Sequence, residues 1–195
     1  METRREFLVG AAGALGLLAL GGAGAAQALG CENMLRPPGG QDETSLIANC
    51  TKCNRCRSIC PENVIITASL EDGLVNVRTP TLDFKRGYCT FCGKCVEVCP
   101  TGALVPYGPN VKIGVARIDK DECVTYSQSG CQRCAEYCPE GALTIDSNGH
   151  PVVDESACNG CGWCEYVCPS ASFGTYSGSK RRGVNVEVSE EARNA

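Results

Sequence analysis

The spacing of cysteine residues constrains this 195-residue chain more than any other feature of its sequence. Seventeen residues are Cys, and sixteen of them fall into four runs. The fourth run reads C-x2-C-x2-C-x3-C-P and ends at Pro169, and the first two runs keep the same spacing. The third run has seven residues between Cys123 and Cys131. The four runs comprise Cys50, Cys53, Cys56 and Cys60; Cys89, Cys92, Cys95 and Cys99; Cys123, Cys131, Cys134 and Cys138; and Cys158, Cys161, Cys164 and Cys168.

This spacing suits the tetrahedral array of iron corners in a [4Fe-4S] cluster. Two-residue gaps place three thiolates around one face of a cluster, and backbone N–H groups of the same loop can point at its sulfurs. The fourth Cys lies one helical turn further on and, in two-cluster ferredoxins, binds the other cluster. Zinc ribbons lack a fourth Cys followed by Pro, and repeated triplets make poor disulfide partners. The sequence therefore predicts that all sixteen cysteines are iron ligands of four [4Fe-4S] clusters. The repeated metal-binding motif is typical of electron-transport proteins.

The motifs leave two questions open. Sequential pairing would join run one with run two and run three with run four, whereas nested pairing would join the outer runs and the inner runs. The long gap after Cys123 raises the second question, because a Cys that missed its cluster would leave a three-iron site. The segment from Asp119 to Cys123 has the form in which ferredoxins approach a first ligand, so Cys123 is predicted to be a ligand.

Charge and histidine content exclude several classes of function. The formal net charge is −4, and four clusters would lower it to about −12. Such a protein should avoid nucleic acid and prefer partners with a basic docking face. His150 is the one histidine, which excludes a Rieske centre, and it lies in a predicted solvated turn. No C-x2-C pair precedes a histidine, so a c-type haem attachment site is also excluded.

Residues 1–28 have the form of a twin-arginine (Tat) export signal. The segment from Thr3 to Leu8 contains Arg4 and Arg5, an uncharged stretch follows, and Ala26-Gln-Ala28 resembles a signal-peptidase site. This route exports folded proteins, so clusters could be inserted before transit to the periplasm or the outer face of the cytoplasmic membrane. Two alternatives remain: retention of the uncharged stretch as an anchor, and lipidation of Cys31, which is otherwise an unused thiol.

The remaining pattern predicts an α+β fold of two ferredoxin-like units, each with small hairpins and short helices around two clusters. Residues 29–45 are predicted to be an extended Pro/Gly-rich linker, 46–119 and 120–175 the two units, and 176–195 a mobile polar tail. The basic triplet 180–182 could alternatively dock on a partner or on anionic lipid. The expected hairpins pair 64–67 with 74–77 and 142–145 with 151–154, and alternation over 112–119 predicts a further strand.

No feature of the sequence indicates a substrate site. It contains no paired nucleophile and base, no histidine cluster, and no phosphate loop outside the signal. We therefore expect an electron-transfer protein, or a subunit of an oxidoreductase complex without its own substrate site. Aromatic residues that lie beside predicted ligands are expected to shield the clusters from water: Tyr88, Phe91, Tyr137, Trp163 and Tyr166.

From about residue 35 to residue 169, the chain resembles the MauM/NapG family of exported four-cluster ferredoxins. The resemblance is carried by Leu35-Arg-Pro-Pro-Gly39, the four cysteine runs, and the segment from Ile113 to Asp119 that leads into the widened gap. It implies a periplasmic relay between a membrane quinol dehydrogenase and a terminal reductase or oxidoreductase, such as a molybdopterin enzyme. A maturation or assembly factor for a periplasmic redox enzyme is the alternative function. The sequence identifies neither the terminal enzyme nor the electron donor.

Overall fold

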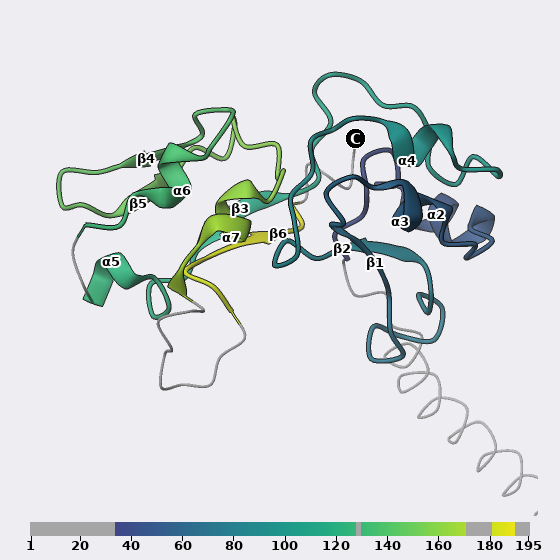
Figure 1. Ribbon diagram of the computed structural model, residues 1–195, viewed down its shortest axis with the longest axis horizontal. Coiled ribbons are helices and arrows are strands. Elements are labelled where there is room, and N and C mark those ends of the chain that lie inside the picture. Colours follow the sequence, from purple (N-terminus) through teal and green to yellow (C-terminus); the bar gives the residue numbers. More distant parts are fainter. Residues whose placement is uncertain (1–33, 128–129, 171–180, 190–195) are drawn as a thin grey trace, which may run out of the picture. The chain divides into compact units, whose positions relative to one another are not determined.

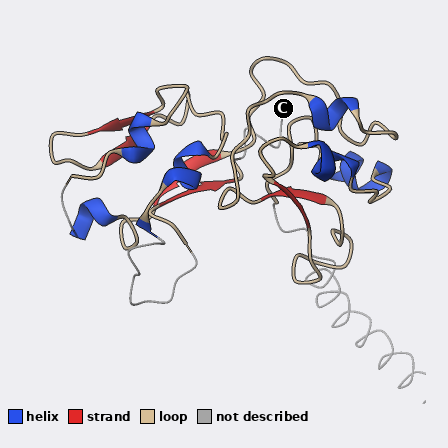
Figure 2. Cartoon of the chain, in the orientation of Figure 1, coloured by secondary structure: helices blue, strands red, loops and turns tan. Residues whose placement is uncertain are grey.

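A computed structural model describes residues 34–127, 130–170 and 181–189 of the chain. The predicted export signal and Cys31 lie outside this part. Short helices and strands alternate with long loops (Figures 1 and 2). The helices are α2 (Glu43–Asn49), α3 (Arg55–Ile59), α4 (Lys94–Glu97), α5 (Val124–Ser127), α6 (Arg133–Glu136) and α7 (Trp163–Val167). The strands are β1 (Ile65–Thr67), β2 (Pro80–Leu82), β3 (Val115–Ile118), β4 (Leu143–Ile145), β5 (Pro151–Val153) and β6 (Val184–Glu187). Among these helices, none has the length and apolar character that crossing a membrane requires.

The first hairpin has a different second strand from the one expected. Strand β1 pairs antiparallel with β2, so that Ile65 lies opposite Leu82, and the predicted return strand at 74–77 is wrong. Residues 68–78 instead form turns in a separate compact unit. Within it, the Asp72 carboxylate accepts hydrogen bonds from Ser69, and the Asn76 amide donates to the Asp72 carbonyl. These local bonds satisfy groups that a strand ladder would otherwise use.

The second hairpin is confirmed. Strands β4 and β5 pair antiparallel, with Leu143 opposite Val153. The Asp146 carboxylate closes the turn between them, because it accepts the backbone N–H groups of Asn148 and His150 at 2.8 Å. Since one short polar side chain satisfies two backbone donors, the turn is specified locally and was visible in the sequence.

The strand expected over 112–119 is confirmed as β3, but its partner is β6 near the C-terminus. A mobile polar tail is therefore the wrong prediction for residues 184–187. Val184 and Val186 are buried, and Arg181 forms ion pairs with Asp119 and Glu187. The alternation of valine with polar residues over 184–188 was the missed signal. Lys180, the first residue of the basic triplet, lies outside the described residues.

The segment that precedes α2 is packed, so the prediction of an extended linker over 29–45 is wrong for its described part. Arg36 is 1% exposed, and its guanidinium donates to the Glu43 carboxylate and, at 2.8 Å, to Thr79 Oγ1. The Leu35 carbonyl accepts the Leu82 N–H at 2.9 Å. The prolines prevent a helix here, and long-range hydrogen bonds hold the segment against β2.

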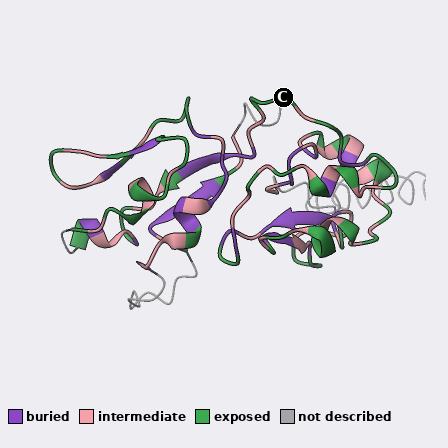
Figure 3. Cartoon of the chain, turned by 45° about the horizontal axis from the view of Figure 1, so that its top comes forward, coloured by how far each residue is buried: buried purple, intermediate pink, exposed green. Residues whose placement is uncertain are grey.

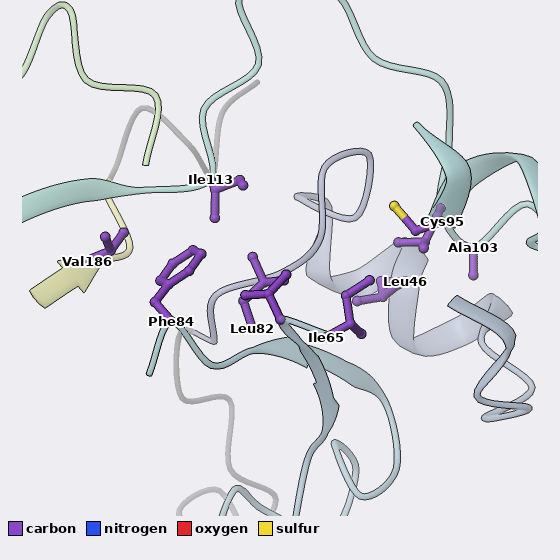
Figure 4. Packing of buried hydrophobic residues seen from close by; sticks show 10 residues of the cluster. Leu46, Ile65, Leu82, Phe84, Cys95, Ala103, Ile113 and Val186 are labelled. Carbon is purple, nitrogen blue, oxygen red and sulfur yellow. The ribbon is translucent and has the colours of Figure 1, made fainter. Parts of the chain in front are cut away.

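Two clusters of buried side chains form the core. Figure 3 shows where the buried residues lie along the chain. The first contains residues of the first two cysteine runs and their hairpin, together with Ile113 and Val186 (Figure 4). The second contains Val115, Ala116 and Val184 beside β4. The predicted boundary between residues 119 and 120 is therefore wrong, because β3 packs in the second core. Residues 34–67 and the described residues from 79 onward belong to one compact unit, which holds both ferredoxin-like halves.

Candidate iron–sulfur centres

A tight turn within the cysteine loop precedes the helix in three of the four runs. Asn54, Gly93 and Gly162 cap α3, α4 and α7 in the left-handed conformation, with φ values of 64°, 74° and 79°. Glycine and asparagine adopt this conformation most readily, so the sequence itself specifies the turn. The third run differs, since Gln132 before α6 has φ −129°. The widened gap is therefore accompanied by a different backbone path.

The folded chain gathers the cysteines into sets of four. Three cavities are each lined by three cysteines of one run and the last cysteine of the run paired with it. Set II is Cys60, Cys89, Cys92 and Cys95; set III is Cys123, Cys131, Cys134 and Cys168; set IV is Cys138, Cys158, Cys161 and Cys164. In these three cavities the runs pair as the sequential alternative predicts.

The remaining four cysteines, Cys50, Cys53, Cys56 and Cys99, are assigned to set I by elimination. The thiols of Cys50 and Cys53 lie close enough to Cys56 to influence its pKa. Cys50, Cys56 and Cys99 pack against the same buried cluster, and helices α3 and α4 are in contact. These contacts are consistent with a set I that takes Cys99 from the second run, as set II takes Cys60 from the first.

The three cavities that these sets line are similar in size. In the described part of the chain, no three His, Cys, Asp or Glu side chains converge on a point where one metal ion could lie. In each of sets II, III and IV, the four cysteines instead line one cavity. This arrangement suits a [4Fe-4S] cluster, which has four iron corners.

Burial and mutual repulsion make several of these thiols hard to ionise without a cation. Burial, aided by neighbouring thiolates, raises the pKa of Cys89 and of Cys134 to about 12. The same causes raise the pKa of Cys56 and of Cys161 to about 11. Coordination to iron deprotonates a thiol outright and supplies the missing positive charge. The donor set therefore fits iron–sulfur clusters.

Hydrogen-bond donors approach several of the sulfurs. The backbone N–H groups of Phe91 and Ala116 donate to Cys89 Sγ and Cys158 Sγ at 3.4 and 3.5 Å. Phe91 lies within a cysteine loop, as expected, whereas Ala116 comes from β3. Such bonds stabilise negative charge on the sulfurs and raise the reduction potential of a bound cluster.

Hydroxyl groups near the sulfurs were not predicted from the sequence. The Thr125 and Ser170 hydroxyls lie 3.2 Å from Cys123 Sγ and Cys168 Sγ, and both sulfurs belong to set III. Because an iron-bound thiolate carries no proton, each hydroxyl would be the donor. The signal was a Ser or Thr two positions after a ligand, and the same pattern places Thr101 at 3.8 Å from the sulfur of a set I cysteine.

The sets differ in exposure. Three cysteines of set IV (Cys158, Cys161 and Cys164) are buried, whereas Cys53 of set I and Cys92 of set II are exposed. Aromatic side chains gather beside set IV: the Trp163 ring stacks on Tyr88, and the Tyr137 and Tyr166 rings lie near this pair. Tyr137 and Tyr166 keep about two fifths of their surface exposed.

Comparison with known proteins gives the family. A family model described as a 4Fe-4S dicluster domain matches residues 49–104, and a second model of the same description matches residues 129–172. The chain is also 33% identical over 137 residues to the ferredoxin-type protein NapF of Haemophilus influenzae. That alignment covers 69% of this chain and 74% of the relative. The chain therefore belongs to the ferredoxin-type proteins with 4Fe-4S dicluster domains, whose iron–sulfur clusters transfer electrons.

Proposed function

We propose that this protein holds four [4Fe-4S] clusters and relays electrons between a membrane quinol-oxidising partner and a terminal oxidoreductase, in particular a molybdopterin enzyme. The observation that supports it is the gathering of twelve cysteines into three sets of four within one compact unit, with the other four cysteines assigned to set I. Four redox groups in one small protein suit a series of centres that pass electrons from one to the next. The finer assignment to the MauM/NapG type, with its export by the twin-arginine route to the periplasm or the outer membrane face, is part of this proposal.

The residues of the chain would perform distinct tasks in such a relay. Bound clusters would supply one-electron chemistry, which the side chains of this chain do not provide themselves. The sixteen thiolates would hold them, and the N–H and hydroxyl donors would stabilise the negative charge that reduction adds. The exposed Cys53 and Cys92 would bring the edges of sets I and II to the surface, where a partner protein could dock. In this proposal the protein has no substrate site of its own.

Metal analysis and redox titration test the central claim. The protein would be purified without oxygen, its iron and acid-labile sulfide measured, and its clusters titrated by EPR spectroscopy. We expect about sixteen irons per chain and reducible cubane signals. About twelve irons would contradict the count of four and direct attention to Cys123. Zinc without sulfide would overturn the electron-transfer function.

A second experiment tests export and separates the proposal from its alternative. Replacing Arg4 and Arg5 together by Lys should keep the protein in the cytoplasm, where cell fractionation would find it; unchanged export would contradict the twin-arginine route. Membranes that oxidise quinol should reduce the clusters of the isolated protein. Stable binding to an apo-oxidoreductase without any cluster turnover would favour a maturation or assembly factor instead.

A further inference from the structure

The two ferredoxin-like halves are joined directly at two of their cysteine loops. The backbone N–H of Cys89, in set II, donates to the carbonyl of Cys161, in set IV, at 2.8 Å. Close by, the Ile113 N–H donates to the Asn159 carbonyl at 2.9 Å. A ligand of one half is thus hydrogen-bonded through the main chain to a ligand of the other half.

Steric fit holds this contact in one register. A Cβ at Gly162 would lie 1.9 Å from the Phe84 ring, and a Cβ at Gly160 would lie 2.5 Å from the backbone of Gly114. Phe84 is 2% exposed and lies beside Val186 and Ile113 (Figure 4). Since the set IV loop has no room to slide over the first half, the two loops are held at a fixed separation.

Aromatic rings cover the same contact. Tyr88 directly precedes Cys89, and Trp163 directly precedes Cys164. Their rings stack with centroids 4.3 Å apart and planes 5° from parallel. The stack links the flanks of sets II and IV and limits the access of water between them.

Within each half, the two sets are also neighbours. Helices α3 and α4, which carry ligands of sets I and II, are in contact, and so are α6 and α7, which carry ligands of sets III and IV. The described contacts therefore connect the sets in the order I, II, IV, III. This order differs from the order of the runs along the chain, because the fourth run is folded back onto the second.

We propose that sets II and IV form the junction through which electrons cross between the halves, so that the path runs I–II–IV–III or the reverse. Set IV, the most buried, would exchange electrons with sets II and III and not directly with a partner protein. In each step one electron leaves one group, which is oxidised by one unit, and enters the next, which is reduced by one unit, with no proton moved. This inference rests on the proposed function, namely that each set holds a [4Fe-4S] cluster.

Loss of an internal set should divide the path, whereas loss of a terminal set should only shorten it. The matched variants are Cys92→Ala and Cys53→Ala, which remove an exposed ligand at the same position of run two and run one. Each holoprotein should contain about twelve irons. In the fully reduced state, neighbouring clusters couple magnetically, and their EPR signals broaden and split.

We expect Cys92→Ala to leave set I isolated and to produce one sharp, uncoupled cubane signal. Cys53→Ala should leave sets II, IV and III coupled and produce no such signal. An uncoupled signal in Cys53→Ala as well would overturn the junction, because set II would then have no partner in the other half. The pair Cys161→Ala and Cys131→Ala repeats the test from the second half, with the uncoupled signal of set III expected in Cys161→Ala alone. If the native protein held four clusters but gave the contrary pattern, the proposed function would survive without this inference.

Discussion

The two halves of this protein share the same order of cysteine runs and hairpin, but they differ in how deeply their cysteines are buried. In each half, a set formed mainly by one run includes the last cysteine of the other run, and a two-stranded hairpin lies between the runs. In the first half, Cys53 and Cys92 reach the surface, whereas in the second half set IV is buried on three of its four cysteines. The same ligand spacing can therefore produce an accessible centre or a shielded one, depending on which segments cover it.

In the second half, strand β6 and the residues directly before it cover the region around set IV. The buried Glu165 carboxylate on α7 accepts the Val186 N–H at 2.7 Å, and burial raises the pKa of that carboxyl. Arg182 donates to the Glu165 carbonyl, and the Gly183 N–H donates to the Ser170 hydroxyl at 2.7 Å. Strand β6 and the residues before it are thus hydrogen-bonded to α7 and to Ser170. Helix α7 carries Cys164, and Cys168 directly follows the helix.

The largest contrast should come from removing one ligand in each half. Cys164→Ala should cost about four irons and also leave an unfilled space in a buried core, whereas Cys53→Ala should cost about four irons at the surface. We expect a clearly lower melting temperature for Cys164→Ala, measured by circular dichroism together with iron analysis. Equal melting temperatures in the two variants would show that burial of set IV adds no stability.

A second contrast uses two glycines that have the same place in their loops. Gly162→Ala should destabilise the fold by about 3 kcal/mol or more, because the new Cβ would overlap the Phe84 ring. Gly93→Ala has open space around its Cβ and should lose only about 1 kcal/mol through its left-handed backbone. Thermal unfolding of the two holoproteins measures the difference. If Gly93→Ala were the worse variant, the close packing of the set IV loop on the first half would be refuted.

A third contrast compares an ion pair of each half. Arg36 is buried where it meets Glu43, so Arg36→Met should cost about 3 kcal/mol by leaving polar groups without their partner. Arg117 and Glu155 are about half exposed, and Arg117→Met should change stability by less than about 0.5 kcal/mol. Unfolding at low and high salt would check both values. A strong effect of Arg117→Met would mean that the exposed pair anchors β3 more firmly than its solvent contact indicates.

The smallest expected effect concerns redox properties and not stability. Thr125→Val should remove a hydroxyl donor from Cys123 Sγ and lower the reduction potential of the set III cluster, because less negative charge is stabilised on the sulfur. Thr144→Val, on the exposed face of β4, is the control. Redox titration followed by EPR would measure the shift. An unchanged reduction potential would show that the Thr125 hydroxyl does not influence the set III cluster.

Local chemistry explains what could be predicted from the sequence. The sixteen candidate ligands, the short helices after Asn54, Gly93 and Gly162, and the hairpin closed by Asp146 depend on residues a few positions apart. Cysteine spacing, left-handed turn residues and an Asp that accepts nearby N–H groups act within one loop. The turns, the short helices and the hairpin therefore follow from the sequence alone, whereas the role of the sixteen cysteines as ligands, the export and the partners remain predictions.

Contacts between distant residues decided the rest. The sequential exchange of last cysteines, the pairing of β3 with β6, the burial of Arg36 and the hydrogen bond from Cys89 to Cys161 each join segments that lie far apart in the sequence. Each run has the same spacing whichever run it pairs with, and a three- or four-residue strand can find several partners. The choice depends on which arrangement buries residues such as Phe84 and Val186 and satisfies the backbone together, and that free energy belongs to the whole tertiary structure.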